Sequence, residues 1–231
     1  MNLAIVGYGK MGRMIERLAP EYGFEVKLRL DVDNNSRFEG MTQQNFRGID
    51  AVVEFTAPSI APQNFERLAQ IGVNVVTGTT GWHDQMDRVR SAVERAGIGF
   101  VWSSNYSIGV RIFSQVVAEA ARLMAKQPQY GAWAWEIHHS AKKDAPSGTL
   151  LALVEKMKQS GYTARIDTGS NRAGAQPGTH EIGFDSPDDT ITIRHTARSR
   201  DGFARGALRA ARWVVGKKGF FDFREIVGEL E

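Results

Sequence analysis

Short, unbroken apolar runs that alternate with helical segments constrain the fold of this chain most. Such runs occur at "LAIVG", "AVVEF", "VNVVTG" and "IGFVWS". Segments with helical spacing, such as Met11–Ala19 and Met86–Ala96, lie between them. Strands that are apolar on both faces belong to parallel sheets covered by helices on both sides. The sequence therefore predicts a doubly wound, Rossmann-like α/β domain over residues 1–108.

The pattern changes after this domain. We expect an amphipathic helix over Arg111–Ala125, an aromatic-rich strand "AWAWEIHH", a helix over Thr149–Ser160 and alternating strands at "THEIGFD" and "TITIRHTA". The stretch "DTGSNRAGAQPG" is predicted to be a Gly-rich loop. These elements predict a smaller α+β domain with a mixed or antiparallel sheet over residues 109–212. The segment from about 213 to 231 is expected to pack back on the first domain.

Composition excludes several classes of protein. The 231 residues are 42% hydrophobic and 24% charged, as in ordinary globular proteins, and include no Cys. No disulfide or thiolate metal site can therefore form, and we predict no metal. The start, "MNLAIVGYGKMG", has neither the charged region of a signal peptide nor the length of a membrane span. We expect a cytoplasmic enzyme without a membrane partner.

The charge is slightly positive. Lys and Arg number 29 against 26 for Asp and Glu, and much of the excess lies in "IRHTARSRDGFARGALRAARWVVGKKG". Such a stretch suits either nucleic acid or a solvated basic face that attracts an anionic substrate. Aromatic residues do not interleave with these charges as a stacking platform would require. We therefore expect no nucleic-acid partner.

The stretch "GYGKMG", Gly7–Gly12, matches the dinucleotide fingerprint G-x-G-x-x-G. It follows a predicted strand, opens a predicted helix and precedes acids about 20 residues on. Of these acids, we expect Asp33 to bind the adenosine ribose and Asp31 to be structural. Asn34 follows in place of a basic residue, which favours NADH, whereas Lys10 could reach a 2′-phosphate. We predict NADH as the preferred cofactor, with NADPH as a possible second one.

Two more loops follow strands at the same edge of the predicted sheet. They are "GTTG", Gly78–Gly81, and "SSNYSIGV", Ser103–Val110. Ligands of such sheets bind beyond the carboxyl ends of the strands. The small residues and hydroxyls of both loops would suit a nicotinamide ring, although ordinary strand-end turns would look the same.

The stretch "EIHHSAKKDAPSGT", Glu136–Thr149, places two histidines and two lysines before a helix start. The histidines end a strand, so their side chains point to opposite faces. Free N–H groups at the helix start, together with the lysines, would bind carboxylates beside a proton donor. The residue pattern alone does not choose between Lys142 and Lys143.

Taken together, the chain resembles the 4-hydroxy-tetrahydrodipicolinate reductase (dihydrodipicolinate reductase) family of the diaminopimelate route to lysine. The resemblance rests on "VGYGKMG", "VVEFTAPS", "GTTG", "SNYSIGV", "EIHHSAKKDAPSGT", "NRAGAQPGTHEIGF" and "HTARSRDGFARGALRAARW", which occur in order over nearly the whole chain. The histidine turn is the most specific of these motifs.

The resemblance implies a role for each matching residue. His138 and Lys142 would be catalytic, handling and donating the proton, and His139, Gly148 and Thr149 would bind the substrate. The residues implied in cofactor binding are Gly7, Tyr8, Gly9, Lys10, Met11, Gly12, Asp33, Gly78, Thr79, Thr80, Ser103, Ser104, Asn105 and Tyr106.

The implied reaction is hydride transfer from the nicotinamide to a cyclic dicarboxylate imine, with loss of water. The family's usual homotetramer, formed through the second-domain sheet, is also implied. Two other functions stay open at this point. A dehydrogenase for another substrate would not need the carboxylate pocket at Gly148 and Thr149. A nucleotide-sensing module without activity would not need His138 and Lys142.

Overall fold

The computed structural model describes residues 1–230, which form two compact units. The first consists of Met1–Ser107 together with the segment from Asp201 onward, and the second is Ile108–Arg200. Each unit has its own sheet and its own apolar core, so each is described by itself.

The first unit is built on a parallel sheet with the strand order β10-β5-β4-β3-β1-β2. The order reverses beside β1, so a topological switch point lies at the carboxyl ends of β1 and β3, where such sheets bind ligands. The strands are β1 (Asn2–Val6), β2 (Glu25–Leu30), β3 (Ala51–Glu54), β4 (Asn74–Thr77), β5 (Gly99–Trp102) and β10 (Gly219–Asp222).

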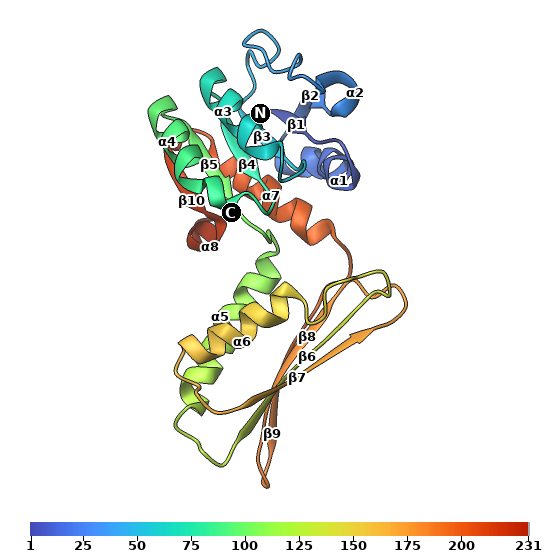
Figure 1. The fold of residues 1–231 in the computed structure, drawn as a ribbon, viewed down its shortest axis with the longest axis vertical. Coiled ribbons are helices and arrows are strands. Elements are labelled where there is room, and N and C mark those ends of the chain that lie inside the picture. The colour runs from blue at the N-terminus through green and yellow to red at the C-terminus, as the bar shows by residue number, and fades with distance from the viewer. Residues whose placement is uncertain (231) are drawn as a thin grey trace. The chain divides into compact units, whose positions relative to one another are not determined.

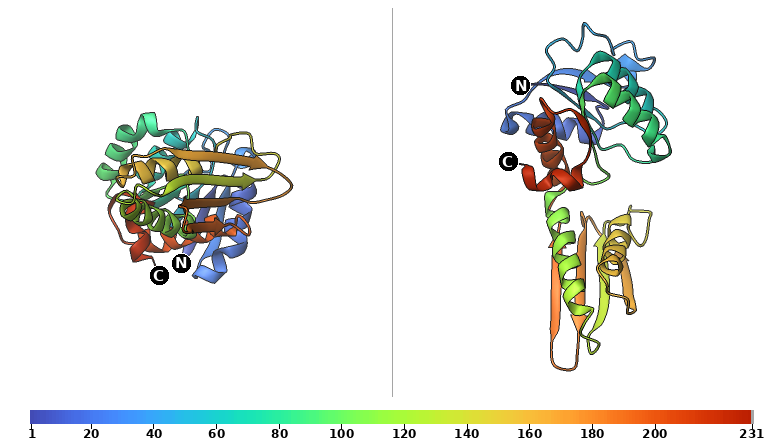
Figure 2. Two further views of the ribbon diagram at one scale, coloured as in Figure 1. Left: turned by 90° about the horizontal axis from the view of Figure 1, so that it is seen from below. Right: turned by 90° about the vertical axis from the view of Figure 1, so that its left-hand side faces the viewer.

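Helices cover both faces of this sheet, as its apolar strands require. Figures 1 and 2 show α1 (Lys10–Leu18) and α7 (Asp201–Val214) on one face and α3 (Ala61–Ile71) and α4 (Met86–Ala96) on the other. The shorter helical segments are η1 (Ala19–Tyr22), α2 (Val32–Asn35), η2 (His83–Gln85), α8 (Phe223–Ile226) and η3 (Val227–Glu229). Of the helices in residues 1–230, none has the length and apolar character to cross a membrane.

The structure divides the chain differently from the boundary expected at residue 212. Helix α7 belongs to the first unit, because it packs on β3, β4 and β5 and beside α1. Its buried side consists mainly of small residues, and Gly206 lies against the backbone of Tyr106 there. An amphipathic pattern shows that a helix has a buried side, but it does not show which sheet the helix covers. The sequence pattern of α7 therefore could not assign this helix to one of the two units.

The second unit has a mixed sheet with the strand order β7-β6-β8-β9. Strands β6 (Gly131–His138) and β7 (Ile166–Arg172) are parallel, and β8 (Thr179–Asp185) and β9 (Thr190–Thr196) extend the sheet in antiparallel pairs. Two helices, α5 (Ile108–Met124) and α6 (Gly148–Gln159), cover one face (Figure 1). This sheet confirms the predicted fold class.

Strand β7 corrects the sequence prediction, which placed a loop from Asp167 onward. Residues 167–172 pair in register with β6, and only residues after Arg172 form a loop. The small residues that suggested a loop have a packing reason, because a Cβ on Gly169 would lie 3.1 Å from the Trp135 ring. As an edge strand, β7 also needs less apolar character than a central one.

We predict that Gly206→Ala destabilises the first unit, because an ideal Cβ would lie 1.8 Å from the Tyr106 carbonyl oxygen. The expected loss is about 1–3 kcal/mol, the usual cost of overpacking. Gly202→Ala is the control on the same helix, since its Cβ would meet nothing within 4 Å. Urea unfolding of both variants measures the effect, and equal stabilities would contradict the packing of α7 on this unit.

Candidate functional site

The glycine loop in the first unit has the geometry of a phosphate-binding turn. Gly7 has φ +90°, and a Cβ there would lie 2.0 Å from the Phe55 carbonyl oxygen. A Cβ on Gly12 would lie 2.3 Å from the Gly7 carbonyl oxygen, whereas Gly9 has open space around it. The first glycine therefore makes the turn, the third brings helix against strand, and the second leaves room for a ligand.

Helix α1 begins within this stretch, at Lys10. Gly9 is its N-cap and offers no side-chain acceptor, so the first N–H groups of the helix have no cap from that residue. Lys10 is exposed at the helix start, and Met11 and Tyr8 are half-buried. Such a helix end attracts phosphate through its N–H groups and its dipole.

The two acids after β2 differ in their surroundings. Asp31 caps α2, accepts a hydrogen bond from Val32 N at 2.9 Å, and its own N–H donates to Asn34 Oδ1 at 2.8 Å. Asp33 lies on α2 with its side chain exposed. Asp31 is therefore structural, as expected, and Asp33 is the acid whose carboxylate is open to a ligand.

A buried carboxylate that the sequence analysis did not single out lies behind these loops. Glu54, fully buried at the end of β3, accepts hydrogen bonds from the hydroxyls of Thr77 at 2.6 Å and Thr79 at 2.9 Å. It also accepts from Thr56 Oγ1 and from Asn64 Nδ2. Burial raises the pKa of Glu54 against the effect of these donors. The network fixes the loops after β3 and β4, where Gly78 packs on the Phe55 ring and Thr80 is exposed.

The loop after β5 is held mainly by its own side chains. Ser103 is buried, and its hydroxyl accepts from Asn105 N and donates to Asn105 O. Tyr106 is buried too, and its hydroxyl donates to the Thr77 carbonyl oxygen at 2.7 Å. Of the residues predicted here, Ser104 is exposed and Asn105 is half-buried. These two are the side chains with surface open to a cofactor.

The histidine turn lies in the second unit. His138 is the last residue of β6 and is buried, whereas His139 follows the strand and is half-buried. Lys142 is half-buried and pairs with Asp144 at 2.7 Å. Lys143 is exposed. The two lysines thus differ in their exposure and in their partners.

The turn leads into α6. Ser147, buried, is the N-cap of this helix, and its hydroxyl accepts from Leu150 N at 3.2 Å. Gly148 is exposed and Thr149 is half-buried in the first turn. No acidic side chain lies in that turn. The carboxylates at this helix start come from outside the helix: Glu136 accepts from Ser147 N at 2.8 Å, and the Gly148 N–H interacts with Asp144. The positive end of the helix thus already attracts carboxylates.

Glu136 connects the turn to its surroundings, although the sequence analysis gave it no role. This fully buried carboxylate accepts from Ser147 N at 2.8 Å and from Ser147 Oγ. It also accepts from Ser170 Oγ at 2.9 Å and Arg172 Nη2 at 2.8 Å. Its Oε2 lies 3.5 Å from His138 Nδ1 and 3.4 Å from His180 Nε2.

The environment sets the protonation of these groups. Burial raises the pKa of Glu136, but the donors Ser147, Arg172 and Ser170 outweigh it and lower the pKa to about 2. Burial lowers the pKa of His138, and the Glu136 charge partly offsets this effect. Burial and the neighbouring His138 lower the pKa of His180 to about 4. Near pH 7 the carboxylate is therefore ionised and both histidines are neutral.

Glu136, His138 and His180 also have the spacing of a metal site, since one ligand atom of each lies within 4.8 Å of the others. The charges do not favour a cation, however. The Glu136 carboxylate already pairs with Arg172, and Lys142 adds a positive charge that acts on both histidines. With the start of α6 beside them, these groups favour an anion.

Strand pairing shows how Glu136 could have been found. Glu136 and His138 are two residues apart on β6, so they share the buried face. The register places Ser170 and Arg172 beside them on β7 and His180 opposite Glu136 on β8. The alternation E-x-H was visible in the sequence, but the partners depend on a register that involves a strand predicted as a loop.

Family models match both parts of the chain. The model of the dihydrodipicolinate reductase N-terminus matches residues 1–106, and that of its C-terminus matches residues 109–227. Among curated relatives, the 4-hydroxy-tetrahydrodipicolinate reductase of Christiangramia forsetii is 32% identical over 100% of this chain and 99% of its own. That of Archaeoglobus fulgidus is 33% identical over 97% of this chain and 100% of its own.

Solved structures share the fold. A dipicolinate-bound dihydrodipicolinate reductase from a Paenisporosarcina species has a TM-score of 0.80 at 20% identity, covering 98% of this chain and 99% of that one. An oxidoreductase from Agrobacterium radiobacter, solved with NAD+, L-tartaric acid and magnesium, has a TM-score of 0.57 at 11% identity, covering 95% and 90%. With both family models matched in order over nearly its whole length, the chain belongs to the dihydrodipicolinate reductase family.

Proposed function

We propose that this chain reduces 4-hydroxy-tetrahydrodipicolinate to tetrahydrodipicolinate with a nicotinamide cofactor, in the diaminopimelate pathway of lysine biosynthesis. Membership of the reductase family supports this reaction. The observation that carries it in the structure is the second-unit site, where a buried histidine and a lysine lie beside the start of α6. A dehydrogenase for an uncharged substrate would not need that combination.

Each part of this site has a task in the reaction. The N–H groups of Gly148 and Thr149, with the side chain of His139, bind a carboxylate of the cyclic substrate. Lys142 donates the proton that accompanies hydride addition and loss of water. His138, neutral at pH 7, handles that proton exchange beside it. Lys143, which is exposed, takes no part.

The first unit binds the cofactor, which supplies the hydride when bound. The glycine loop and the start of α1 would hold the pyrophosphate, and Lys10 would make NADPH usable by reaching its 2′-phosphate. Asp33 accepts the hydrogen bonds of the adenosine ribose and disfavours a 2′-phosphate, so NADH is preferred and NADPH is the second cofactor. The loops at Gly78–Thr80 and Ser104–Asn105 hold the nicotinamide end.

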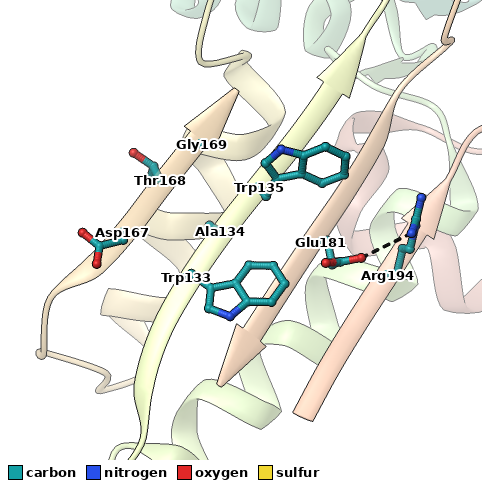
Figure 3. A pocket seen from close by; sticks show the side chains of 8 residues that line it. All are labelled: Trp133, Ala134, Trp135, Asp167, Thr168, Gly169, Glu181 and Arg194. Carbon is teal, nitrogen blue, oxygen red and sulfur yellow. Dashed lines mark ion pairs between the residues drawn. The ribbon is translucent and has the colours of Figure 1, made fainter. Parts of the chain in front are cut away.

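We further propose that the chain forms a homotetramer through the open face of the second-unit sheet. Figure 3 shows Trp133 and Trp135 side by side on that face. On the neighbouring strands, Glu181 and Arg194 form an ion pair with 3.5 Å between Oε2 and Nη1. Large aromatic side chains with polar neighbours are typical of interfaces. Sedimentation equilibrium of the whole chain measures its oligomeric state.

We also propose that the chain is located in the cytoplasm, as suits an enzyme of a biosynthetic pathway.

The proposed reaction predicts rapid reduction of the product that forms when aspartate semialdehyde condenses with pyruvate. We expect kcat/KM to be higher with NADH than with NADPH, because the exposed Asp33 carboxylate repels a 2′-phosphate. Parallel assays of both cofactors measure the ratio. A higher kcat/KM with NADPH would refute the preference, and no turnover with either would refute the reaction.

The second prediction concerns the proton-handling residues. His138→Gln or Lys142→Ala should lower kcat by about 100-fold or more, the usual contribution of general acid–base catalysis. The Kd of NADH should not change, because these residues belong to the other unit. Lys143→Ala is the matched control and should keep wild-type kcat. Near-normal turnover in either of the first two variants would overturn the assigned roles.

A further inference from the structure

Resting on the proposed function, we propose that Glu136 is the positioning residue of this site. Its carboxylate fixes the ring of His138 with the proton on Nδ1 and, through Ser147, fixes the helix start that binds the substrate. Glu136 would thus align the proton-handling group and the anion site with a single side chain.

The contacts place Glu136 between the two parts of the site. One carboxylate oxygen accepts from Ser147 N at 2.8 Å, and the other accepts from Ser147 Oγ, so both anchor the N-cap of α6. The second oxygen, Oε2, also faces His138 Nδ1 at 3.5 Å. A displacement of Glu136 would therefore move the helix start and the histidine ring together.

Besides packing edge-on against His180, the ring of His138 faces Glu136 and Gly178. Its Nδ1 is buried and has no hydrogen-bond partner, and the Glu136 oxygen at 3.5 Å is the acceptor that it faces. Catalytic hydrogen bonds without substrate are often this long and shorten in the complex. On the other side, Nε2 lies under Gly178, where an added Cβ would come within 2.9 Å of it. A proton on Nδ1 leaves Nε2 free to exchange one.

The ionised state of Glu136 is what makes this possible. Four hydrogen bonds reach its two oxygens, from Ser147 N, Ser147 Oγ, Ser170 Oγ and Arg172 Nη2, and Oε2 also faces His138 Nδ1 and His180 Nε2. An ionised carboxylate offers about four lone-pair sites for these bonds, whereas a protonated one gives up part of its acceptor capacity to its own O–H. His180 Nε2 faces the same Glu136 oxygen as His138 Nδ1. The His180 ring also packs edge-on against the His138 ring, with 5.1 Å between the ring centroids, so His180 forms part of the surroundings of His138.

The test is ¹⁵N NMR of the His138 imidazole in the whole wild-type chain without substrate, beside the variants Glu136→Gln and Glu155→Gln. In the wild type, Nδ1 should be protonated and Nε2 unprotonated. In Glu136→Gln the pKa of His138 should fall further, because the charge that raises it is lost while Lys142 and Arg172 still lower it. Glu155 is exposed on α6 and serves as the control.

Kinetics give the second readout. In Glu136→Gln we expect kcat to fall about tenfold, since a hydrogen bond to a charged group contributes roughly that factor. KM for the dicarboxylate substrate should rise, whereas the Kd of NADH and all values for Glu155→Gln should stay at wild type. A variant that lost only stability would unfold at a lower temperature and keep the kinetics of its folded fraction.

Two outcomes would overturn the proposal. One is a wild-type His138 with its proton on Nε2, a measurement that needs no variant to fold. The other is a folded Glu136→Gln with the wild-type pKa of His138 and the wild-type kcat. The NMR arms need no turnover, so failure of the reductase reaction in the wild type would be seen separately.

Discussion

The second unit depends on one buried negative charge. Removing a carboxylate from water costs several kcal/mol unless donors replace the water. Glu136 is fully buried, and its donors come from the N-cap of α6 and from two positions on β7, with histidines of β6 and β8 in contact. The same contacts that make the charge tolerable therefore join the edge strand, the sheet centre and the helix start. This frame bears on function, because the groups it holds are the ones proposed to bind and protonate the substrate.

The first unit solves a similar problem in another way. Glu54 is also fully buried, but its partners are three threonine hydroxyls and an amide, and burial raises the pKa of its carboxyl group. Those hydroxyls belong to the last residue of β4, Thr77, and to the loops after β3 and β4 at the carboxyl edge of the sheet. Glu136, by contrast, pairs with Arg172 and keeps a low pKa. One carboxyl group thus shapes loops by hydrogen bonding, and the other supplies a fixed charge beside a histidine.

The sequence predicted those elements that depend only on residues close together in the chain. Strands β1, β3, β4 and β5 follow from the apolar runs, and the helix Met86–Ala96 follows from helical spacing. The glycine loop follows from its motif. Strand β7 was not predicted, because its small and polar residues are typical of a loop. The contact of Gly169 with the Trp135 ring, which explains one of these small residues, is not visible in the sequence. The partners of Glu136 could not be predicted, because His180 and Arg172 reach it only through strand pairing. Tyr106 was expected near the cofactor, but its side chain lies in the core.

The proposed reaction requires the second unit to bind a dicarboxylate. Calorimetric titration of pyridine-2,6-dicarboxylate into the whole chain saturated with NADH tests it most directly, with the monocarboxylate picolinate beside it. We expect the dicarboxylate to bind at least about tenfold more tightly, since its second carboxylate adds a charge-assisted hydrogen bond. Equal affinities, or no binding of either acid while NADH binds, would contradict it.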